Sequence, residues 1–212
     1  MQTPVRFNEE EFARLKKITP IYQWGLETLL TKLRIVHEDL RNFQSKDVID
    51  YIASRIKTPE SIAQKLHGLG VEVTAESARE HLRDIAGIRI LCPFSVDIYF
   101  LADLIRSIPD LRIESEKDYV GKPKPSGYRS YHIIAHVPVF YSGKMDEVAV
   151  EIQIRTEAMN FWATLEHKVR YKYKGDIPKH LSDELASIAD QISEMDNRMY
   201  KIYDIISLIN DK

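Results

Sequence analysis

The strongest constraint on the fold is the stretch VAVEIQIR, residues 148–155, in which apolar and polar side chains alternate. The apolar positions are Val148, Val150, Ile152 and Ile154, and the polar ones are Glu151, Gln153 and Arg155. Because successive side chains of a β-strand point to opposite faces, the pattern predicts a strand with one apolar and one polar face. The polar row is consistent either with a solvated sheet face or with the wall of a pocket, since antiparallel sheets often expose one face.

Helices and strands are mixed along the rest of the chain. Apolar spacing predicts a first helix over about 20–43, with a core face of Trp24, Leu29, Leu33, Val36, Leu40 and Phe43. Thr58 and Pro59 begin a second helix that ends at the glycines 68 and 70, whereas residues 51–57 fit strand, helix or loop. A short polar helix over 75–84, strands over 86–94, 111–120 and 128–140, and a helix over 96–108 complete the pattern. This order indicates an α+β fold whose sheet is covered on one face.

Two further helices are predicted after the strand at 148–156. Thr156 can cap the first, whose expected core face is Ala158, Phe161, Trp162, Leu165 and Val169, and whose polar stripe is Asn160, Thr164, His167 and Tyr171. The last segment repeats apolar residues from 181 to 209 at spacings of four and three. Such a stripe packs either on a helix of the same chain, here the N-terminal one, or on a second copy.

Composition limits the class of protein. The chain has 212 residues, 44% of them hydrophobic, and a net charge of −2, so a polyanion can be bound only through local clusters of Lys and Arg. Its single cysteine, Cys92, lies in an apolar run, which excludes an internal disulfide and an ordinary cysteine zinc site. No window approaches the ~20 apolar residues of a membrane span and no signal peptide is visible. We therefore expect a cytoplasmic protein without membrane association.

The polar row has neighbours that could bind a cation and a phosphate chain. Tyr128, Ser130 and His132 lie on the expected adjacent strand, and Asp84 lies at a helix-to-strand junction. Carboxylates from two elements, here Asp84 and Glu151, can hold Mg²⁺ while nearby cations neutralise phosphate oxygens. The candidate cations are Arg55, Lys57, Lys65, Lys117, Lys122 and Lys124, although any single one of them is more often a solubilising surface residue than a ligand contact. The P-loop, dinucleotide-binding and HExxH motifs are missing.

Four blocks, in order, resemble a known family. SRIKTPES, HLRDIAGIRI, KDYVGKPKPSGYRSYH and VEIQIRTEAMNFWATLEHKVRYKY are similar to the synthetase domain of the Rel/Spo alarmone enzymes, specifically the small alarmone synthetases. The resemblance implies a mixed sheet of about five strands, of nucleotidyltransferase-like type, flanked by terminal helices. It divides the chain into a helical segment 1–46, a catalytic domain 47–175 and a C-terminal helix 176–212.

The same resemblance implies an activity and a set of site residues. The activity is Mg²⁺-dependent transfer of the β,γ-pyrophosphate of ATP to the 3'-hydroxyl of GTP or GDP, which makes pppGpp or ppGpp. Asp84 and Glu151 correspond to the metal ligands, and Glu151 also to the base that takes the hydroxyl proton. The donor ATP contacts correspond to Arg55, Lys57, Ser61, Lys65 and Arg89. The acceptor contacts correspond to Lys117, Lys124, Tyr128, His132, Gln153, Asn160 and His167, with Tyr128 stacking on guanine.

The resemblance has limits and alternatives. Ser115 stands where longer relatives carry Arg, so their GDP-versus-GTP preference does not transfer, and without a hydrolase region the chain should make alarmone and not destroy it. Small synthetases are typically homotetramers, and some are regulated by pppGpp or single-stranded RNA. The alternatives are a toxin that pyrophosphorylates the 3' end of tRNA, and a non-catalytic alarmone- or RNA-binding module.

Overall fold

The computed structural model describes residues 9–44, 46–173 and 177–210. The predicted boundary between residues 175 and 176 lies outside these ranges. The elements, in chain order, are α1 Glu9–Gln44, β1 Tyr51–Ile56, α2 Pro59–Leu69, α3 Ala75–His81, β2 Ala86–Cys92, α4 Ser95–Arg106, β3 Arg112–Asp118, β4 Tyr131–Tyr141, β5 Lys144–Thr156, α5 Glu157–Lys172 and α6 Lys179–Asn210.

The five strands form one mixed sheet in the order β1-β2-β5-β4-β3. β5 is the central strand: it pairs in parallel with β2 and antiparallel with β4, and the two outer pairs are antiparallel. The register places Gly87 of β2 and Ile134 of β4 on either side of Glu151. The α+β class and the five-stranded mixed sheet are therefore confirmed.

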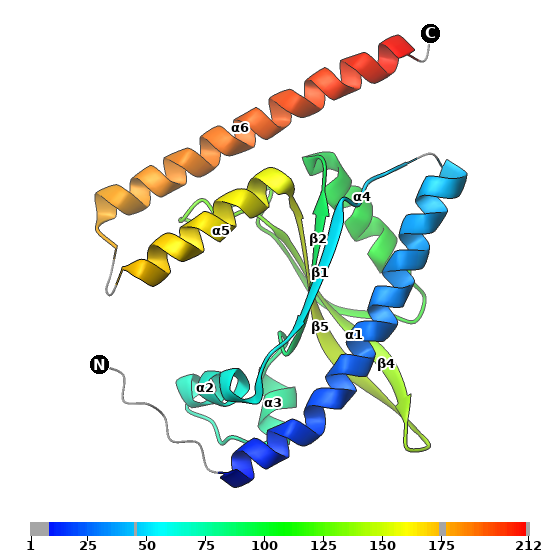
Figure 1. Ribbon diagram of the computed structural model, residues 1–212, viewed down its shortest axis with the longest axis vertical. Coiled ribbons are helices and arrows are strands. Elements are labelled where there is room, and N and C mark those ends of the chain that lie inside the picture. The colour runs from blue at the N-terminus through cyan, green and yellow to red at the C-terminus, as the bar shows by residue number, and fades with distance from the viewer. Residues whose placement is uncertain (1–8, 45, 174–176, 211–212) are drawn as a thin grey trace.

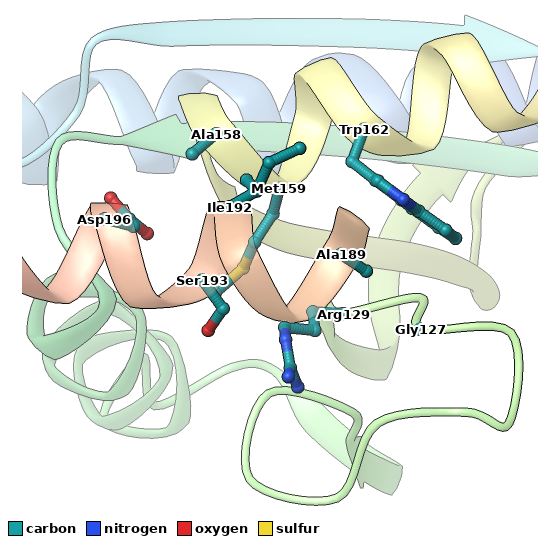
Figure 2. Close-up of a pocket in the computed structure, with 9 residues that line it drawn as sticks. All are labelled: Gly127, Arg129, Ala158, Met159, Trp162, Ala189, Ile192, Ser193 and Asp196. Carbon is teal, nitrogen blue, oxygen red and sulfur yellow. The ribbon is translucent and has the colours of Figure 1, made fainter. Parts of the chain in front are cut away.

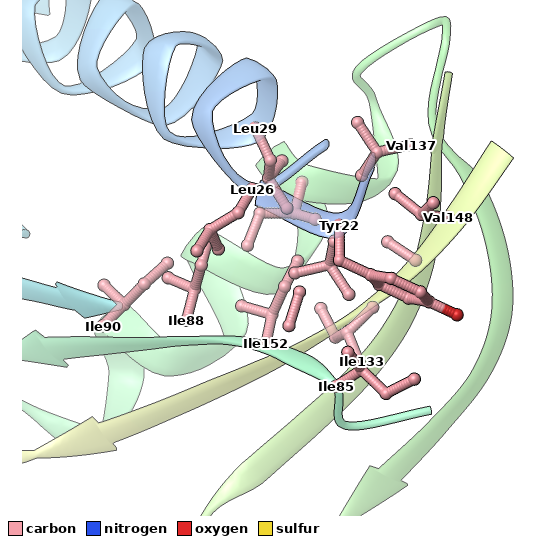
Figure 3. Close-up of a cluster of buried hydrophobic side chains, with 14 of the residues drawn as sticks. Tyr22, Leu26, Leu29, Ile85, Ile88, Ile90, Ile133, Val137, Val148 and Ile152 are labelled. Carbon is pink, nitrogen blue, oxygen red and sulfur yellow. The ribbon is translucent and has the colours of Figure 1, made fainter. Parts of the chain in front are cut away.

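Helices α1 and α4 cover the apolar face of this sheet, and α5 lies on the other side (Figure 1). Figure 3 shows Tyr22, Leu26 and Leu29 of α1 packed against apolar side chains of the strands. Gly25 permits this close approach, because a Cβ there would lie 2.2 Å from Cγ2 of Val148. The apolar row of β5 is thus the floor of the core, which leaves its polar row on the opposite face.

The first helix differs from its prediction in length and in rotation. α1 continues through Pro20 to Glu9, and it buries Leu15 and Ile18 ahead of the predicted start. Trp24 and Phe43, expected on the core face, are 43% and 83% exposed. The helical spacing was right, but Trp and Phe lie beside the buried row, where a large ring can cover the surface without entering the core.

Two local predictions from capping residues are confirmed, and one open segment is settled. The Thr58 side chain accepts a hydrogen bond from the Ser61 N–H, and the helix ends at Gly70, whose φ is 72°. Thr156 likewise accepts from the Met159 N–H at the start of α5. Residues 51–56, left undecided, form edge strand β1.

The last two helices correct two predictions. α5 buries Met159 and Trp162, whereas Phe161, Leu165 and Val169 of the expected core face are 59%, 44% and 48% exposed. α6 packs on α5, where the Trp162 indole donates a hydrogen bond to the Leu185 carbonyl, and within the described residues it has no extensive contact with the N-terminal helix. The apolar stripe of α6 stays largely exposed from residue 195 onward, so packing among the described residues does not account for it.

Two expectations from composition concern the single cysteine and membrane-spanning helices. Cys92 is buried as predicted, and burial raises the pKa of its thiol. Among the residues that the structure describes, no helix has the length and apolar character that would be needed to span a bilayer.

Candidate active site

The polar row of β5 faces a pocket and not open solvent. The Glu151 side chain is 16% exposed and Arg155 is 5% exposed. The row is joined by hydrogen bonds: Gln153 Nε2 donates to Glu151 Oε2 at 3.0 Å, and Arg155 Nη2 donates to Gln153 Oε1 at 2.9 Å. A buried, hydrogen-bonded row is expected for a binding wall, because buried polar groups without partners are costly.

Asp84 lies between α3 and β2 and is held by two lysines. Nζ of Lys57 and Nζ of Lys65 are each 2.7 Å from Asp84 Oδ2. Burial opposes ionisation of this carboxyl, but the two lysine hydrogen bonds outweigh it and lower its pKa. The other oxygen, Oδ1, is buried and has no hydrogen-bond partner within the described part of the chain. An ionised carboxylate with one free buried oxygen is suited to binding a cation.

Glu151 is the second carboxylate. Its Oε1 lies 3.4 Å from His132 Nδ1 on the neighbouring strand. Burial disfavours the charged form, yet the contacts with His132 and Gln153 lower the pKa of Glu151, while the charge of Asp84 acts in the opposite direction. Glu151 is therefore ionised at neutral pH and ready to accept a proton.

Asp84 and Glu151 line one cavity of about 350 Å³. Four residues that the sequence singled out line it with them: Lys65, Lys117, Lys124 and His132. Within the described residues, no group of three or more His, Cys, Asp or Glu side chains could enclose a metal ion. Two carboxylates and open space fit Mg²⁺, which commonly binds to one or two protein carboxylates and takes its remaining ligands from phosphates and water.

Two further cavities continue from the first along the sheet. One of about 250 Å³ is lined by Arg55 and Arg89 and shares Glu151 with the first cavity. The next, of about 450 Å³, shares Arg55, Arg89 and Gln153 with it and extends to Tyr128 and to Thr164 and His167 of α5. The polar stripe predicted for α5 therefore faces this cavity at Thr164 and His167; the Tyr171 side chain lies outside the described part.

The Tyr128 ring lines the third of these cavities and contacts His132, which lines the first. Its hydroxyl lies 2.8 Å from His132 Nε2 and accepts a hydrogen bond from Arg155 Nη2. Cationic groups of Lys124 and Arg155 lie 5.0 and 4.9 Å from the ring centroid. An aromatic ring with cations beside it is a suitable platform for a purine base.

The remaining predicted residues lie at the edge of this region. Lys57 contacts Asp84, Ser61 lies in the first turn of α2, and Asn160 Oδ1 accepts a hydrogen bond from Arg89 Nη1 at 3.4 Å. Predicted donor and acceptor contacts share cavities. Lys65 lines the first cavity together with Lys117 and Lys124, and Arg55 lines the third together with Tyr128. The assignment of individual residues to donor or acceptor stays a prediction.

Sequence reasoning gave no role to three residues that the structure places here. Arg155 contacts Tyr128, Arg83 lines the carboxylate cavity, and Tyr119 makes an edge contact with Tyr128 at 6.1 Å between ring centroids. Alternation placed Arg155 on the correct face, and Arg83 directly precedes Asp84. Tyr119 gave no signal, because its position depends on how the turn-rich loop after β3 folds back.

Comparisons with known proteins identify the family of the chain. Residues 54–176 match the model of the region found in RelA / SpoT proteins. The chain is 43% identical over 182 residues to the GTP pyrophosphokinase YwaC of Bacillus subtilis, covering 86% of this chain and 87% of that protein.

Solved structures give the same result. The crystal structure of small alarmone synthetase 2 from Bacillus subtilis matches this chain with a TM-score of 0.80 and 41% sequence identity. The match covers 89% of this chain and 97% of the solved chain. Small alarmone synthetase 1 of that organism, bound to its product pppGpp, has a TM-score of 0.80 and 33% identity, with coverages of 90% and 96%. Fold, sequence and the shared cavity of Asp84 and Glu151 agree, and the chain belongs to the RelA/SpoT family, among the small alarmone synthetases.

Proposed function

We propose that this protein is a Mg²⁺-dependent pyrophosphokinase that transfers the β,γ-pyrophosphate of ATP to the 3'-hydroxyl of GTP or GDP. The observation that carries the proposal is the cavity shared by Asp84 and Glu151, which has lysines on its wall and an aromatic platform beside it. The names of its relatives, GTP pyrophosphokinase and small alarmone synthetase, support the same reaction.

The residues present have the chemistry that this transfer needs. The acceptor 3'-oxygen forms a bond to the β-phosphorus of ATP, the bond from that phosphorus to the α,β-bridging oxygen breaks, and AMP leaves with that oxygen. Glu151 takes the hydroxyl proton, and a carboxylate with a lowered pKa is in the correct ionisation state to do so. Phosphoryl-type transfer is accelerated mainly by positioning and neutralisation, so no covalent intermediate is required.

Cations and the metal ligands supply the neutralisation. Asp84 and Glu151 would hold Mg²⁺, which when bound neutralises phosphate charge and orients the phosphate chain. Lys57 and Lys65 are positioned beside Asp84, and Lys117 and Lys124 line the same cavity. The guanidinium groups of Arg55 and Arg89 offer planar surfaces for adenine.

We further propose that the protein is a homo-oligomer. The exposed apolar stripe of α6 includes Met195, Met199, Ile202, Ile206 and Ile209, which are 52–65% exposed. An apolar row of this length on one helix is typical of an interface with a second copy. Light scattering at several protein concentrations measures the assembly state. A monomer at all concentrations would contradict the proposed homo-oligomer.

The reaction is tested by supplying substrate pairs to the purified protein. With ATP, Mg²⁺ and GTP or GDP, we expect AMP and pppGpp or ppGpp in equal amounts, separated by anion-exchange chromatography. Transfer of label from [γ-³²P]ATP to deacylated tRNA, but not to the free nucleotide, would identify the tRNA-modifying alternative. Nucleotide binding without release of AMP would indicate a non-catalytic module. The Glu151→Gln variant is the inactive control that gives the background signal in each assay.

A further inference from the structure

The loop that carries Tyr128 is anchored on the C-terminal helix. It connects β3 to β4 and is closed by its own hydrogen bonds, from the Gly127 N–H to the Lys124 carbonyl at 2.8 Å and from the Lys124 N–H to the Tyr128 carbonyl at 3.1 Å. These bonds define the shape of the loop but not its position over the sheet. The residues on either side of Tyr128, Gly127 and Arg129, both contact α6 (Figure 2).

Gly127 brings the loop backbone against two alanines of α6. Its φ of +87° lies in the left-handed region, where side chains are strained. A Cβ at this position would lie 2.5 Å from Cβ of Ala189 and 3.1 Å from Cα of Ala186. The loop therefore approaches α6 as closely as glycine against alanine allows, and neither side has room for a larger residue.

Arg129 adds an ion pair on the other side of Tyr128. Its Nη2 lies 2.7 Å from Asp190 Oδ1 of α6, and the Arg129 side chain is only 15% exposed. The buried Nε has no partner among the described residues. Because the Asp190 side chain is 72% exposed, the pair adds a modest stabilisation to this position of the loop.

Tyr128 points the other way, toward the cavity. The hydroxyl contacts His132 Nε2 and Arg155, both of the sheet. The segment 127–129 is thus held between α6 and the sheet, with the ring on the sheet side. A shift of α6 or a loss of either anchor would displace the ring relative to Gln153 and Arg155.

We propose that α6 is a positioning element for the acceptor half of the site, acting through Arg129–Asp190 and Gly127 on Tyr128; this inference rests on the proposed function. Within the described residues, no hydrogen bond or ion pair joins Gly127 or Arg129 to the predicted donor contacts on β1, α2 and β2, although Arg55 and Arg89 line a cavity with Tyr128. Weakening the anchors therefore raises KM for the guanine nucleotide and leaves KM for ATP unchanged. If the anchors had a purely structural role, weakening them would change KM for the guanine nucleotide and KM for ATP together, or would lower the melting temperature.

The test uses steady-state kinetics on the full chain with ATP and GDP, each varied at saturating levels of the other. Asp190→Asn is expected to raise KM for GDP by about two- to fivefold, the range expected for loss of one partly exposed ion pair. Arg129→Asp is expected to raise it by about tenfold or more, and combining it with Asp190→Arg to restore most of the affinity. Glu194→Gln, on an exposed residue one turn further along α6, is the matched control and changes neither constant.

Two results separate this inference from the proposed function. If the unmodified protein makes no alarmone, the proposed function is wrong. If it is active but Asp190→Asn leaves KM for GDP unchanged, or changes KM for ATP equally, only the positioning role is wrong. Calorimetric titration of GDP into the same variants gives the affinity without turnover, and an unchanged dissociation constant in Arg129→Asp would also overturn the role.

Discussion

The ion pair between Arg79 and Asp146 offers a quantitative test of how the site is supported. Arg79 of α3 donates to both carboxylate oxygens of Asp146 at 3.2 and 2.9 Å, and Tyr141 donates to the same carboxylate at 2.8 Å. These contacts join α3 to the hairpin between β4 and β5. Since α3 ends shortly before Asp84, they also support the approach to that carboxylate. The perturbation is Asp146→Asn, which keeps the shape and removes the charge.

The magnitude follows from the ionisation of Asp146. Hydrogen bonds from Arg79 are the main cause that lowers its pKa from 3.8 to about 2. A difference of that size corresponds to an upper limit of about 2.4 kcal/mol at neutral pH. Because the Arg79 side chain is 35% exposed, solvent screening reduces this, and we expect a loss of about 1–2 kcal/mol.

The lowered pKa of Asp146 also determines how its contribution to stability changes with pH. A carboxyl with a lowered pKa in the folded state adds stability that is fully present above its unfolded pKa of about 3.8 and is lost as pH falls toward about 2. Urea unfolding of both proteins at several pH values measures it: the difference should be largest near neutral pH and shrink below about pH 4. A loss under about 0.5 kcal/mol at pH 7, or one independent of pH, would refute the reasoning. Asp110→Asn is the control, since Asp110 pairs with Lys32 but is 49% exposed and should cost less.

Four further predictions concern catalysis and packing. Glu151→Gln should lower turnover about 10²–10⁴-fold with little change in melting temperature, as removal of a general base does; near-normal turnover would show that Glu151 is not the base. Because the Glu151 pKa is lowered, turnover should not fall through protonation of this group between about pH 5 and 7. Because the proposed reaction depends on Mg²⁺, excess EDTA should abolish turnover, and added Mg²⁺ should restore it. Gly25→Ala should cost about 1–3 kcal/mol in urea unfolding, because the new Cβ would meet Val148 Cγ2 at 2.2 Å, and an unchanged midpoint would mean that α1 shifts freely.

The parts of the fold that sequence predicts well are those fixed by local physics. Alternation gave both faces of β5, although the strand begins at Lys144 and not at the predicted Val148, and capping residues gave the starts of α2 and α5. What failed was the rotation of long helices, as at Phe161 and Trp24, because several apolar residues compete for one buried face and the tertiary partner decides among them. The partner of α6 was wrong for the same reason, since a stripe shows that a helix packs but not on what.

The site divides in the same way. Residues such as Glu151 and Gln153 follow from strand period alone, whereas gathering Asp84 and Lys117 around Glu151 requires the parallel pairing of β2 with β5 and the antiparallel order β5-β4-β3. Pairing between distant strands leaves little trace in a single sequence, so family resemblance supplied what spacing could not. Tyr119 and the anchoring of the Tyr128 loop on α6 escaped both, because they depend on contacts made by an irregular loop.

The charge arrangement explains how a chain with a net charge of −2 can be built to bind polyphosphates. Positive charge is gathered at one cavity, where Lys65, Lys117 and Lys124 face two carboxylates, and Lys57 adds a second ammonium to Asp84. Both lysines at Asp84 contact the same oxygen, so two cations face one carboxylate, and the other oxygen has no hydrogen-bond partner among the described residues. A phosphate chain adds oxygens that these ammonium groups can bind, so nucleotide binding relieves repulsion between cations that the folded protein already holds together. A local excess of cations therefore favours phosphorylated ligands at this cavity in spite of the total charge of the chain.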